Sequence, residues 1–267
     1  QYHPPMATRE SILADMTALP PGKDMEDKAY VGFFEGKKLV AVLDWISGYP
    51  AKETAWIGLF MVSAEKQGKG VGSGIIRDMA ASLKAVGYRE TLLHMFSHTG
   101  THVDPPAHLF AGRTTLDAFP PEQFIGRALV IDCRGLGEGE AITMAQLLPY
   151  GDKPAQADFL LFNTGWDARW GTDAYFGDYP CVDDQLLDYI LAGEYKGIGF
   201  DVIGLDPIAD ENLTRHKRLF REKDILNIEN LKNLHLCGSD LFSFGCFPLK
   251  WEGSDGAPVR AMAWFED

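Results

Sequence analysis

The sequence predicts an α/β protein, because predicted strands alternate with predicted helices in a chain of ordinary globular composition. Short apolar runs bounded by turn residues indicate strands, and segments with apolar residues at helical spacing alternate with them. Of the 267 residues, 46% are hydrophobic and 24% are charged, as in ordinary globular proteins. The apolar runs are too short to cross a bilayer, so we expect no membrane partner.

Charge divides the chain into two parts. Residues 1–90 hold 11 Lys/Arg and 11 Asp/Glu, whereas residues 91–267 hold 14 and 27 and carry the whole net charge of -13. We therefore expect two segments of separate origin, 1–90 and 91–267. The negative charge argues against nucleic acid as a partner. Four cysteines without a C-x-x-C pair indicate a reduced, cytoplasmic protein.

The first segment has the order strand, strand, strand, helix. YVGFFEGKKLVAVLDWI (30–46) predicts two strands joined by a turn, and ETAWIGLFMV (53–62) predicts a third. In the stretch 63–88, apolar residues from Ile75 to Leu83 follow helical spacing, and a glycine-rich turn precedes them. Backbone N–H groups at such a turn, beside the positive end of a helix dipole, suit a pyrophosphate.

That turn resembles a known signature. EKQGKGVGSGIIRDM is similar to the Q/R-x-x-G-x-G/A signature of the GNAT acyltransferases, with Gln67, Gly68, Gly70 and Gly72 at the signature positions. The resemblance implies that these residues bind acetyl-CoA. Only about the N-terminal half of a GNAT domain is recognisable, so the alternative is a glycine-rich turn without a ligand.

The second segment alternates strands and helices. We expect one strand to run from residue 91 through 104, and short apolar strands in the stretches 128–133, 159–165 and 195–206. The stretches 143–150 and 181–193 predict short helices, the second with Asp and Gly suited to its ends. The stretch 248–265 predicts a hairpin with GSDG as its turn.

HTGTHVDPPAHL, residues 98–109, crowds three histidines and an aspartate together. Gly100 and two prolines disfavour a helix here, and the residue before a proline is pushed toward extended conformations. In an extended chain, His98, His102 and Asp104 point to one side. Two imidazoles and a carboxylate on one side are ligands for a divalent metal, Zn²⁺ or Mn²⁺. His108 follows beyond the proline turn.

Two further residues are weaker candidates on spacing alone. His216 lies among Arg and Lys residues and could simply be solvated, and Glu229 could cap a helix. The loop FNTGWDARW (162–170) brings Asn163, Trp166 and Trp170 as candidates to line a pocket for an aromatic substrate, although loop tryptophans more often simply pack.

The stretch HTGTHVDPPAH fits the H-x-G-T-H-x-D-x-P-x-H motif of the cyclase family of metal-dependent hydrolases, and the similarity extends from about residue 91 to the end of the sequence. The resemblance implies that His98, His102 and Asp104 hold one metal. It also implies that Asp104 bridges to a second ion held by His216, with Glu229 between the two. His108 would be the general acid/base. A swivelling β/β/α fold and a homo-oligomer are implied as well.

We therefore expect a metal-dependent amidohydrolase that cleaves an amide, an aryl formamide or a cyclic amide in a small carbonyl substrate. A divalent ion makes a water nucleophilic near neutral pH, and His108 would move the proton to the leaving nitrogen. One or two ions are compatible with the motif. Two alternatives stay open: an acyl-CoA-dependent N-acetyltransferase, and an inactive chimera of two partial domains joined near residue 90.

Overall fold

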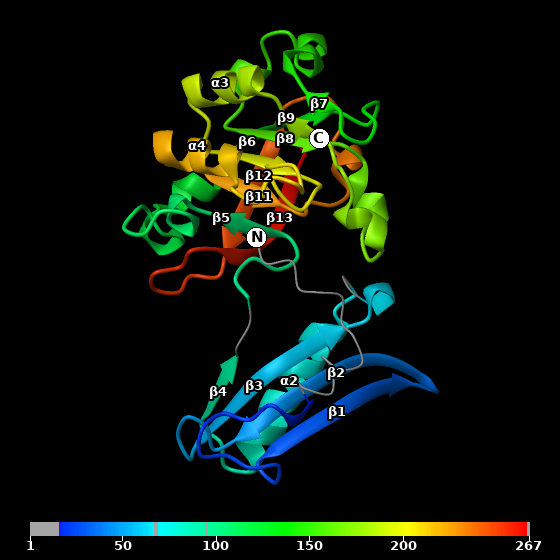
Figure 1. Cartoon of the computed structure of the whole chain (residues 1–267), viewed down its shortest axis with the longest axis vertical. Helices are drawn as coiled ribbons and strands as arrows, with labels where there is room; N and C mark the ends of the chain where they lie inside the picture. The colour runs from blue at the N-terminus through cyan, green and yellow to red at the C-terminus, as the bar shows by residue number, and fades with distance from the viewer. Residues whose placement is uncertain (1–15, 67–68, 94–95, 266–267) are drawn as a thin grey trace. The chain divides into compact units, whose positions relative to one another are not determined.

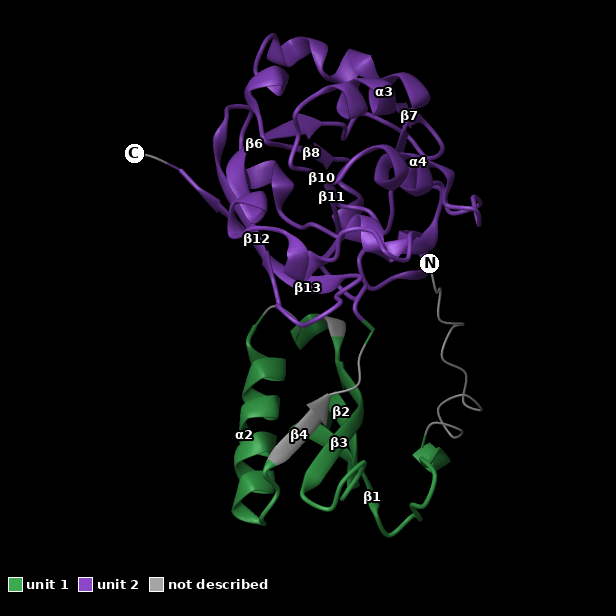
Figure 2. Cartoon of the chain, turned by 90° about the vertical axis from the view of Figure 1, so that its left-hand side faces the viewer, with its two compact units in different colours: residues 1–96 green, residues 97–267 purple. Residues whose placement is uncertain are grey.

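The protein is described by a computed structural model over residues 16–66, 69–93 and 96–265. The chain divides into two compact units, Gln1–Phe96 and Ser97–Asp267 (Figures 1 and 2). Over the described ranges, the helices lack the combination of length and apolar character that a membrane span requires.

The first unit is a four-stranded sheet with one long helix. Its strands lie in the order β1-β2-β3-β4, the first three antiparallel and β4 parallel to β3. The bounds are β1 Lys28–Glu35, β2 Lys38–Ser47, β3 Thr54–Val62, β4 Glu90–Leu93 and helix α2 Val71–Ala85. The predicted β1–β2 hairpin, β3 and α2 are confirmed. Gly36 in the hairpin turn has φ 61°, a conformation that glycine adopts without steric cost.

The second unit is a closed barrel with two helices. Its strands follow the order β10-β11-β5-β13-β12-β6-β8. The strands are β5 His102–Asp104, β6 Ile125–Asp132, β8 Phe159–Asn163, β10 Gly197–Phe200, β11 Leu226–Glu229, β12 Phe242–Pro248 and β13 Ala257–Trp264. A separate parallel pair joins β7 Ala141–Ile142 to β9 Cys181–Val182. The helices are α3 Asp184–Ala192 and α4 Thr214–Glu222.

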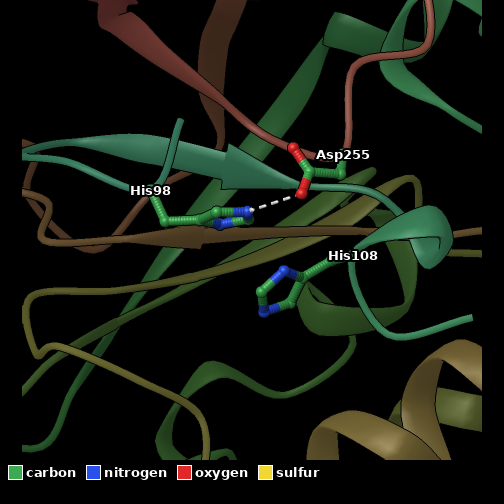
Figure 3. A group of neighbouring side chains, drawn as sticks. All are labelled: His98, His108 and Asp255. Carbon is green, nitrogen blue, oxygen red and sulfur yellow. Dashed lines mark ion pairs between the residues drawn. The ribbon is translucent and has the colours of Figure 1, made fainter. Parts of the chain in front are cut away.

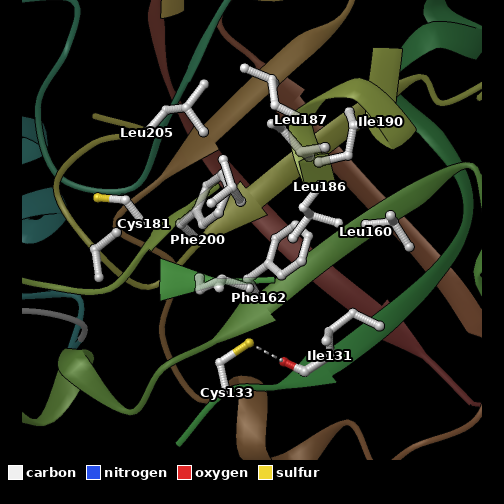
Figure 4. Close-up of a cluster of buried hydrophobic side chains, with 14 of the residues drawn as sticks. Ile131, Cys133, Leu160, Phe162, Cys181, Leu186, Leu187, Ile190, Phe200 and Leu205 are labelled. Carbon is white, nitrogen blue, oxygen red and sulfur yellow. Dashed lines mark hydrogen bonds between the residues drawn. The ribbon is translucent and has the colours of Figure 1, made fainter. Parts of the chain in front are cut away.

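Alternating residues of the barrel strands enter two different cores. Val130, Leu161 and Ile228 belong to a cluster inside the barrel, because successive side chains of a strand point to opposite faces. Their neighbours Ile131 and Phe162 belong to a second cluster, which the helices cover (Figure 4). In that second cluster the α3 side chains Leu186, Leu187 and Ile190 pack on the outer surface of the parallel strands β6, β8 and β10.

The predicted α3 begins and ends as the sequence indicates. The carboxylate of Asp183 accepts a hydrogen bond from the backbone N–H of Leu186, and Gly193 follows the last helical residue. The hairpin predicted over 248–265 is confirmed in its second strand, β13, and in GSDG as part of the connection, but its first strand, β12, ends at Pro248, where the predicted stretch begins.

Two predicted elements are wrong. The strand expected over 91–104 is two strands, because β4 ends at Leu93 in the first unit and β5 begins at His102 in the second. The helix expected over 143–150 is two 3₁₀ turns, Met144–Gln146 and Leu148–Tyr150. Pro149 lies in the second turn, and a proline has no N–H to continue a helix.

Candidate metal centre

The centre is built on two short neighbouring strands. In the antiparallel pair β5–β11, His102 lies opposite Glu229, and Asp104 lies opposite Asn227. Residues two apart on a strand share a face, so these four polar side chains form one patch. Val103, between the two β5 ligands, points into the barrel core. All four polar residues of the patch are buried.

His102 is held in one orientation. Its Nδ1 lies 2.8 Å from the carbonyl oxygen of Gly100, which accepts the ring hydrogen and leaves Nε2 facing the patch. Nε2 lies 3.3 Å from Asp104 Oδ1 and 3.4 Å from Glu229 Oε2. Thus Nε2 is directed at the two carboxylates with which it would share a metal ion.

His216 reaches the same patch from helix α4. Its Nε2 lies 2.9 Å from Glu229 Oε1 and 3.9 Å from Asp104 Oδ2. Its Nδ1 lies 2.5 Å from Oδ2 of Asp206, a fully buried carboxylate. Asp206 also accepts hydrogen bonds from the backbone N–H groups of Arg215 and His216, at 2.6 and 3.1 Å, and so satisfies two free N–H groups at the start of α4.

Asp206 is a site residue that the sequence reasoning missed. It lies ten positions before His216, at the end of the stretch predicted as a strand, and no motif marks it. A carboxylate on the far nitrogen of a ligating histidine fixes the tautomer of that ring and raises its basicity. The strand β10 ends at Phe200, six residues before Asp206, so the position of this carboxylate next to a strand could not have marked it.

His98 lies at the open side of the centre. Its Nδ1 is 2.7 Å from Asp104 Oδ1, and its side chain is 24% exposed. Nε2 is 3.7 Å from Oδ2 of Asp255, a second residue that the sequence reasoning missed (Figure 3). Ser97 Oγ donates a hydrogen bond of 3.0 Å to Asp255 Oδ1. A side chain at Gly256 would overlap the His98 ring, because a Cβ there would lie 2.4 Å from Cε1 of His98.

His108 approaches from the 3₁₀ turn Pro106–His108. Its ring lies beside that of His98, with 4.0 Å between the ring centroids (Figure 3). The centroid of the His216 ring is 6.2 Å away. Burial lowers the pKa of His108 to about 4. His108 is therefore neutral near pH 7, a state in which an imidazole accepts a proton.

The pKa values of the other groups describe a centre of mutually stabilised charges. Burial opposes the charged form of His102, but Asp104 and Glu229 outweigh it and raise the pKa of that ring to about 9. Burial acts in the same way on His216, yet Asp206 and Glu229 raise its pKa to about 10. The imidazoles in turn hold the pKa values of Asp104 and Glu229 below their usual range despite burial.

The donor set fits a divalent ion. The ligand atoms of His98, His102 and Asp104 lie within 4.8 Å of one another, and so do those of Asp104, His216 and Glu229. Buried carboxylates beside imidazole nitrogens are the ligands of zinc and manganese sites. Within the described part of the chain, Nε2 of His98 is a buried polar atom without a hydrogen-bond partner, as expected when a binding partner is still to be added. The five residues proposed as ligands therefore converge on one place.

The predicted aromatic loop packs instead of opening. Trp166 is 5% exposed, belongs to the helix-covered core and donates from Nε1 to the carbonyl of Tyr175 at 2.9 Å. Asn163 is also buried, whereas Trp170 is 39% exposed. The packed alternative therefore holds for Trp166.

The glycine-rich turn lies in the first unit. Gln67 and Gly68 are outside the described residues. Gly70 precedes α2 with φ 77°, and Gly72 packs against the side chains of β3, where an added Cβ would lie 3.3 Å from Val62. Binding of acetyl-CoA by this turn stays a prediction, as do the separate origins of residues 1–90 and 91–267.

Comparison with known proteins decides the family. The family model described as "Putative cyclase" matches residues 35–207. The chain belongs to the Cyclase family. Cyclase-like protein 3 of Oryza sativa subsp. japonica is 28% identical over 172 residues, and the match spans 62% of each chain. The isatin hydrolase of Roseibium aggregatum is also 28% identical, over 62% of this chain and 71% of its own.

Solved structures of the family share the fold. Isatin hydrolase A from Ralstonia solanacearum matches with a TM-score of 0.57 at 21% identity, over 89% of this chain and 87% of its own. An isatin hydrolase bound to the product analogue thioisatinate matches with a TM-score of 0.58 at 19% identity, over 96% and 98%. The mixed α/β fold with its β-barrel is therefore that of this family, as the motif resemblance implied.

The resemblance of residues 1–90 to GNAT acyltransferases receives only weak support. An acetyltransferase from Thermus thermophilus is 29% identical over 27% of this chain, with a TM-score of 0.26. The Cyclase match itself begins inside the first unit, at residue 35, and ends before His216 and Glu229. The last two proposed ligands are thus placed at the centre by the barrel and α4, outside the matched residues.

Proposed function

We propose that this Cyclase-family chain is a metal-dependent hydrolase of small amides, with aryl formamides and cyclic amides as the substrate class. One observation carries the proposal, which is that the five proposed ligands converge on one place with a neutral His108 beside them. They come from β5, from β11, from α4 and from the loop before β5, and they are His98, His102, Asp104, His216 and Glu229. The relatives include isatin hydrolases, which agrees with a cyclic amide as substrate.

Within this proposal each residue has a task. His98, His102 and Asp104 would hold one ion, and His216 and Glu229 would hold a second that Asp104 bridges. When bound, a divalent ion supplies Lewis-acid chemistry, polarising a carbonyl oxygen and lowering the pKa of a water toward neutrality. The neutral His108 accepts a proton from the attacking water and delivers it to the leaving nitrogen.

The orientation of the ligands is set before any ion arrives. Gly100 and Asp206 each fix the far nitrogen of a histidine, and burial of Asp104 and Glu229 excludes competing water from their carboxylates. Such preorganisation lowers the cost of assembling the site. Zinc and manganese both suit this mixture of imidazole and carboxylate donors.

The test is hydrolysis by the full chain stripped of metal with a chelator. Isatin serves as the cyclic amide and formanilide as the aryl formamide, and each is followed by absorbance with and without added Zn²⁺ or Mn²⁺. We expect turnover only after an ion is restored. Two outcomes would contradict the proposal. One is equal turnover with and without chelator, and the other is a metal-loaded chain that hydrolyses neither amide. The predicted homo-oligomer and cytoplasmic location remain predictions.

A further inference from the structure

Asn227 is a fully buried polar residue at the centre that the motif does not include. It lies on β11 two positions before Glu229 and opposite Asp104 on β5. Its side-chain oxygen Oδ1 is buried and has no hydrogen-bond partner among the residues that the structure describes. An unpaired acceptor in a protein interior is destabilising, so its retention here calls for a physical reason.

The amide nitrogen of Asn227 faces the three atoms that would hold an ion. Nδ2 lies 2.9 Å from Glu229 Oε1, 3.0 Å from His216 Nε2 and 3.4 Å from Asp104 Oδ2. These are the three residues of the second candidate ligand group. The amide of Asn227 therefore lies within reach of any ion placed among them.

The present orientation pairs only one of the two polar atoms of the amide, because Nδ2 donates to the carboxylates of Glu229 and Asp104 while Oδ1 has no partner among the described residues. Both nitrogens of His216 face carboxylates, Nδ1 toward Asp206 and Nε2 toward Glu229. The amide nitrogen therefore lies 3.0 Å from a ring nitrogen that already faces the Glu229 carboxylate, while the amide oxygen faces no partner among the described residues. Rotation by 180° about the last side-chain bond exchanges Oδ1 and Nδ2 without moving any other atom of the residue.

We propose that Asn227, turned in this way, is a fourth ligand of the divalent ion held by Asp104, His216 and Glu229, and that it binds through its amide oxygen. The hydrogen bonds that Nδ2 now donates to the two carboxylates are lost when the amide turns. A bound ion attracts all four ligand atoms in their place, and Oδ1 gains the partner that it now lacks. Three oxygen donors and one nitrogen form an oxygen-rich set, which suits Mn²⁺. This inference rests on the metal site of the proposed function and adds a ligand to it.

The experiment is a titration of the metal-stripped full chain with Mn²⁺, in which free Mn²⁺ is counted by its electron paramagnetic resonance signal. Asn227→Leu keeps the approximate size of the side chain and removes both polar atoms. We expect this variant to bind the ion of this group at least about tenfold more weakly than the wild type. Asn227→Asp keeps an oxygen ligand and should bind Mn²⁺ at least as tightly as the wild type.

The matched control is Asn163→Leu. Asn163 is buried, ends a barrel strand and lies outside every candidate ligand group, so its replacement should leave Mn²⁺ affinity unchanged. Unchanged affinity in Asn227→Leu would overturn the inference, and tighter binding would too, because the amide would then compete with the ion.

Two further outcomes separate this inference from the proposed function. If Asn227→Leu does not fold, weaker Mn²⁺ binding by Asn227→Asp overturns the inference on its own. A wild-type chain that binds no Mn²⁺ overturns the inference and the metal site together. A wild-type chain that binds Mn²⁺ and loses affinity in Asn227→Leu, yet hydrolyses neither amide, supports the inference and contradicts only the proposed activity.

Discussion

Asp206 and His216 are joined by a hydrogen bond of 2.5 Å between a fully buried carboxylate and the ring nitrogen Nδ1. The same carboxylate caps the start of α4, so one side chain fixes both the helix and the imidazole that the helix carries. The ring can therefore present only Nε2 to the centre.

Replacing Asp206 by Asn should weaken metal binding by about 10–100-fold, the range for removing a partner of a ligating histidine. The new amide can donate to Nδ1, which moves the ring hydrogen to Nε2, where the ion would bind. Calorimetric titration of Zn²⁺ into metal-stripped protein measures the effect. Asp210→Asn is the control, because Asp210 accepts a hydrogen bond from the N–H of Thr214 in the same helix and has no contact with His216. Equal affinities in the two variants would contradict the role of Asp206.

Gly256→Ala should displace the ring of His98. The added methyl would lie 2.4 Å from Cε1 and 2.7 Å from Nε2 of that ring, closer than atoms approach without one of them moving. We expect the group of His98, His102 and Asp104 to lose its ion while the ion of His216 and Glu229 stays. Elemental analysis of bound metal per chain measures this. Gly135→Ala is the control, since an added methyl there meets nothing within 4 Å. Full metal content in Gly256→Ala would show that His98 is not needed as a ligand.

His108→Gln should keep its metal and lose turnover by about 10²–10⁴-fold, the usual contribution of a general acid/base. The imidazole of His98, whose ring centroid is 4.0 Å away, has its Nδ1 directed at Asp104 and is itself a proposed ligand of the ion, so we do not expect it to replace His108. Turnover and bound metal are measured on the same sample. Normal turnover with normal metal content would show that another group moves the proton.

Metal binding should release protons near pH 7. In the ion-free chain the pKa values of His102 and His216 are raised to about 9 and about 10, so both rings are charged at neutral pH and must lose their protons to bind an ion. Affinity should therefore rise as pH increases from 7 toward 9–10. Calorimetry in buffers of different ionisation enthalpy counts the protons released. An affinity that does not change over this range would contradict the charged state of the two rings.

The ion-free chain should show the opposite trend in stability. A raised pKa means that folding favours the charged ring, and this contribution is fully present below the unfolded value of about 6.5. It is lost as pH rises through the folded values of about 9 and 10. Thermal unfolding of metal-stripped protein from pH 7 to 10 should give a falling melting temperature. The metal-loaded chain should not show this fall, because its rings are already deprotonated.

Local patterns were enough to predict the elements with strong periodicity. The hairpin of β1 and β2, the helix α2 and the capped helix α3 follow from residues that are neighbours in sequence. The unbroken strand expected over 91–104 is wrong because its two ends belong to different units, and local patterning alone does not show where one unit ends and the next begins. Pairing partners, not propensity, decide where β5 begins.

At the centre, the motif marked the residues proposed as ligands and omitted the residues around them. Asp206, Asn227 and Asp255 come from three separate stretches, and each reaches the site only through the register of the barrel or the start of α4. No spacing rule within one segment connects Asn227 to Asp104, since 123 positions separate them. The positions of the side chains that orient the proposed ligands therefore depend on how the strands pair in the closed barrel.

The three-residue strand β5 lies between β11 and β13 in the ring of strands, and it carries two of the proposed ligands. Barrel closure and assembly of the centre are consequently the same folding event, because neither is complete until this short segment docks. The chain must order more than a hundred intervening residues before a metal can be captured, so non-local contacts dominate the rate of this step. An ion that binds only after β5 has docked stabilises the closed barrel, and it slows the undocking of β5 more than it speeds its docking.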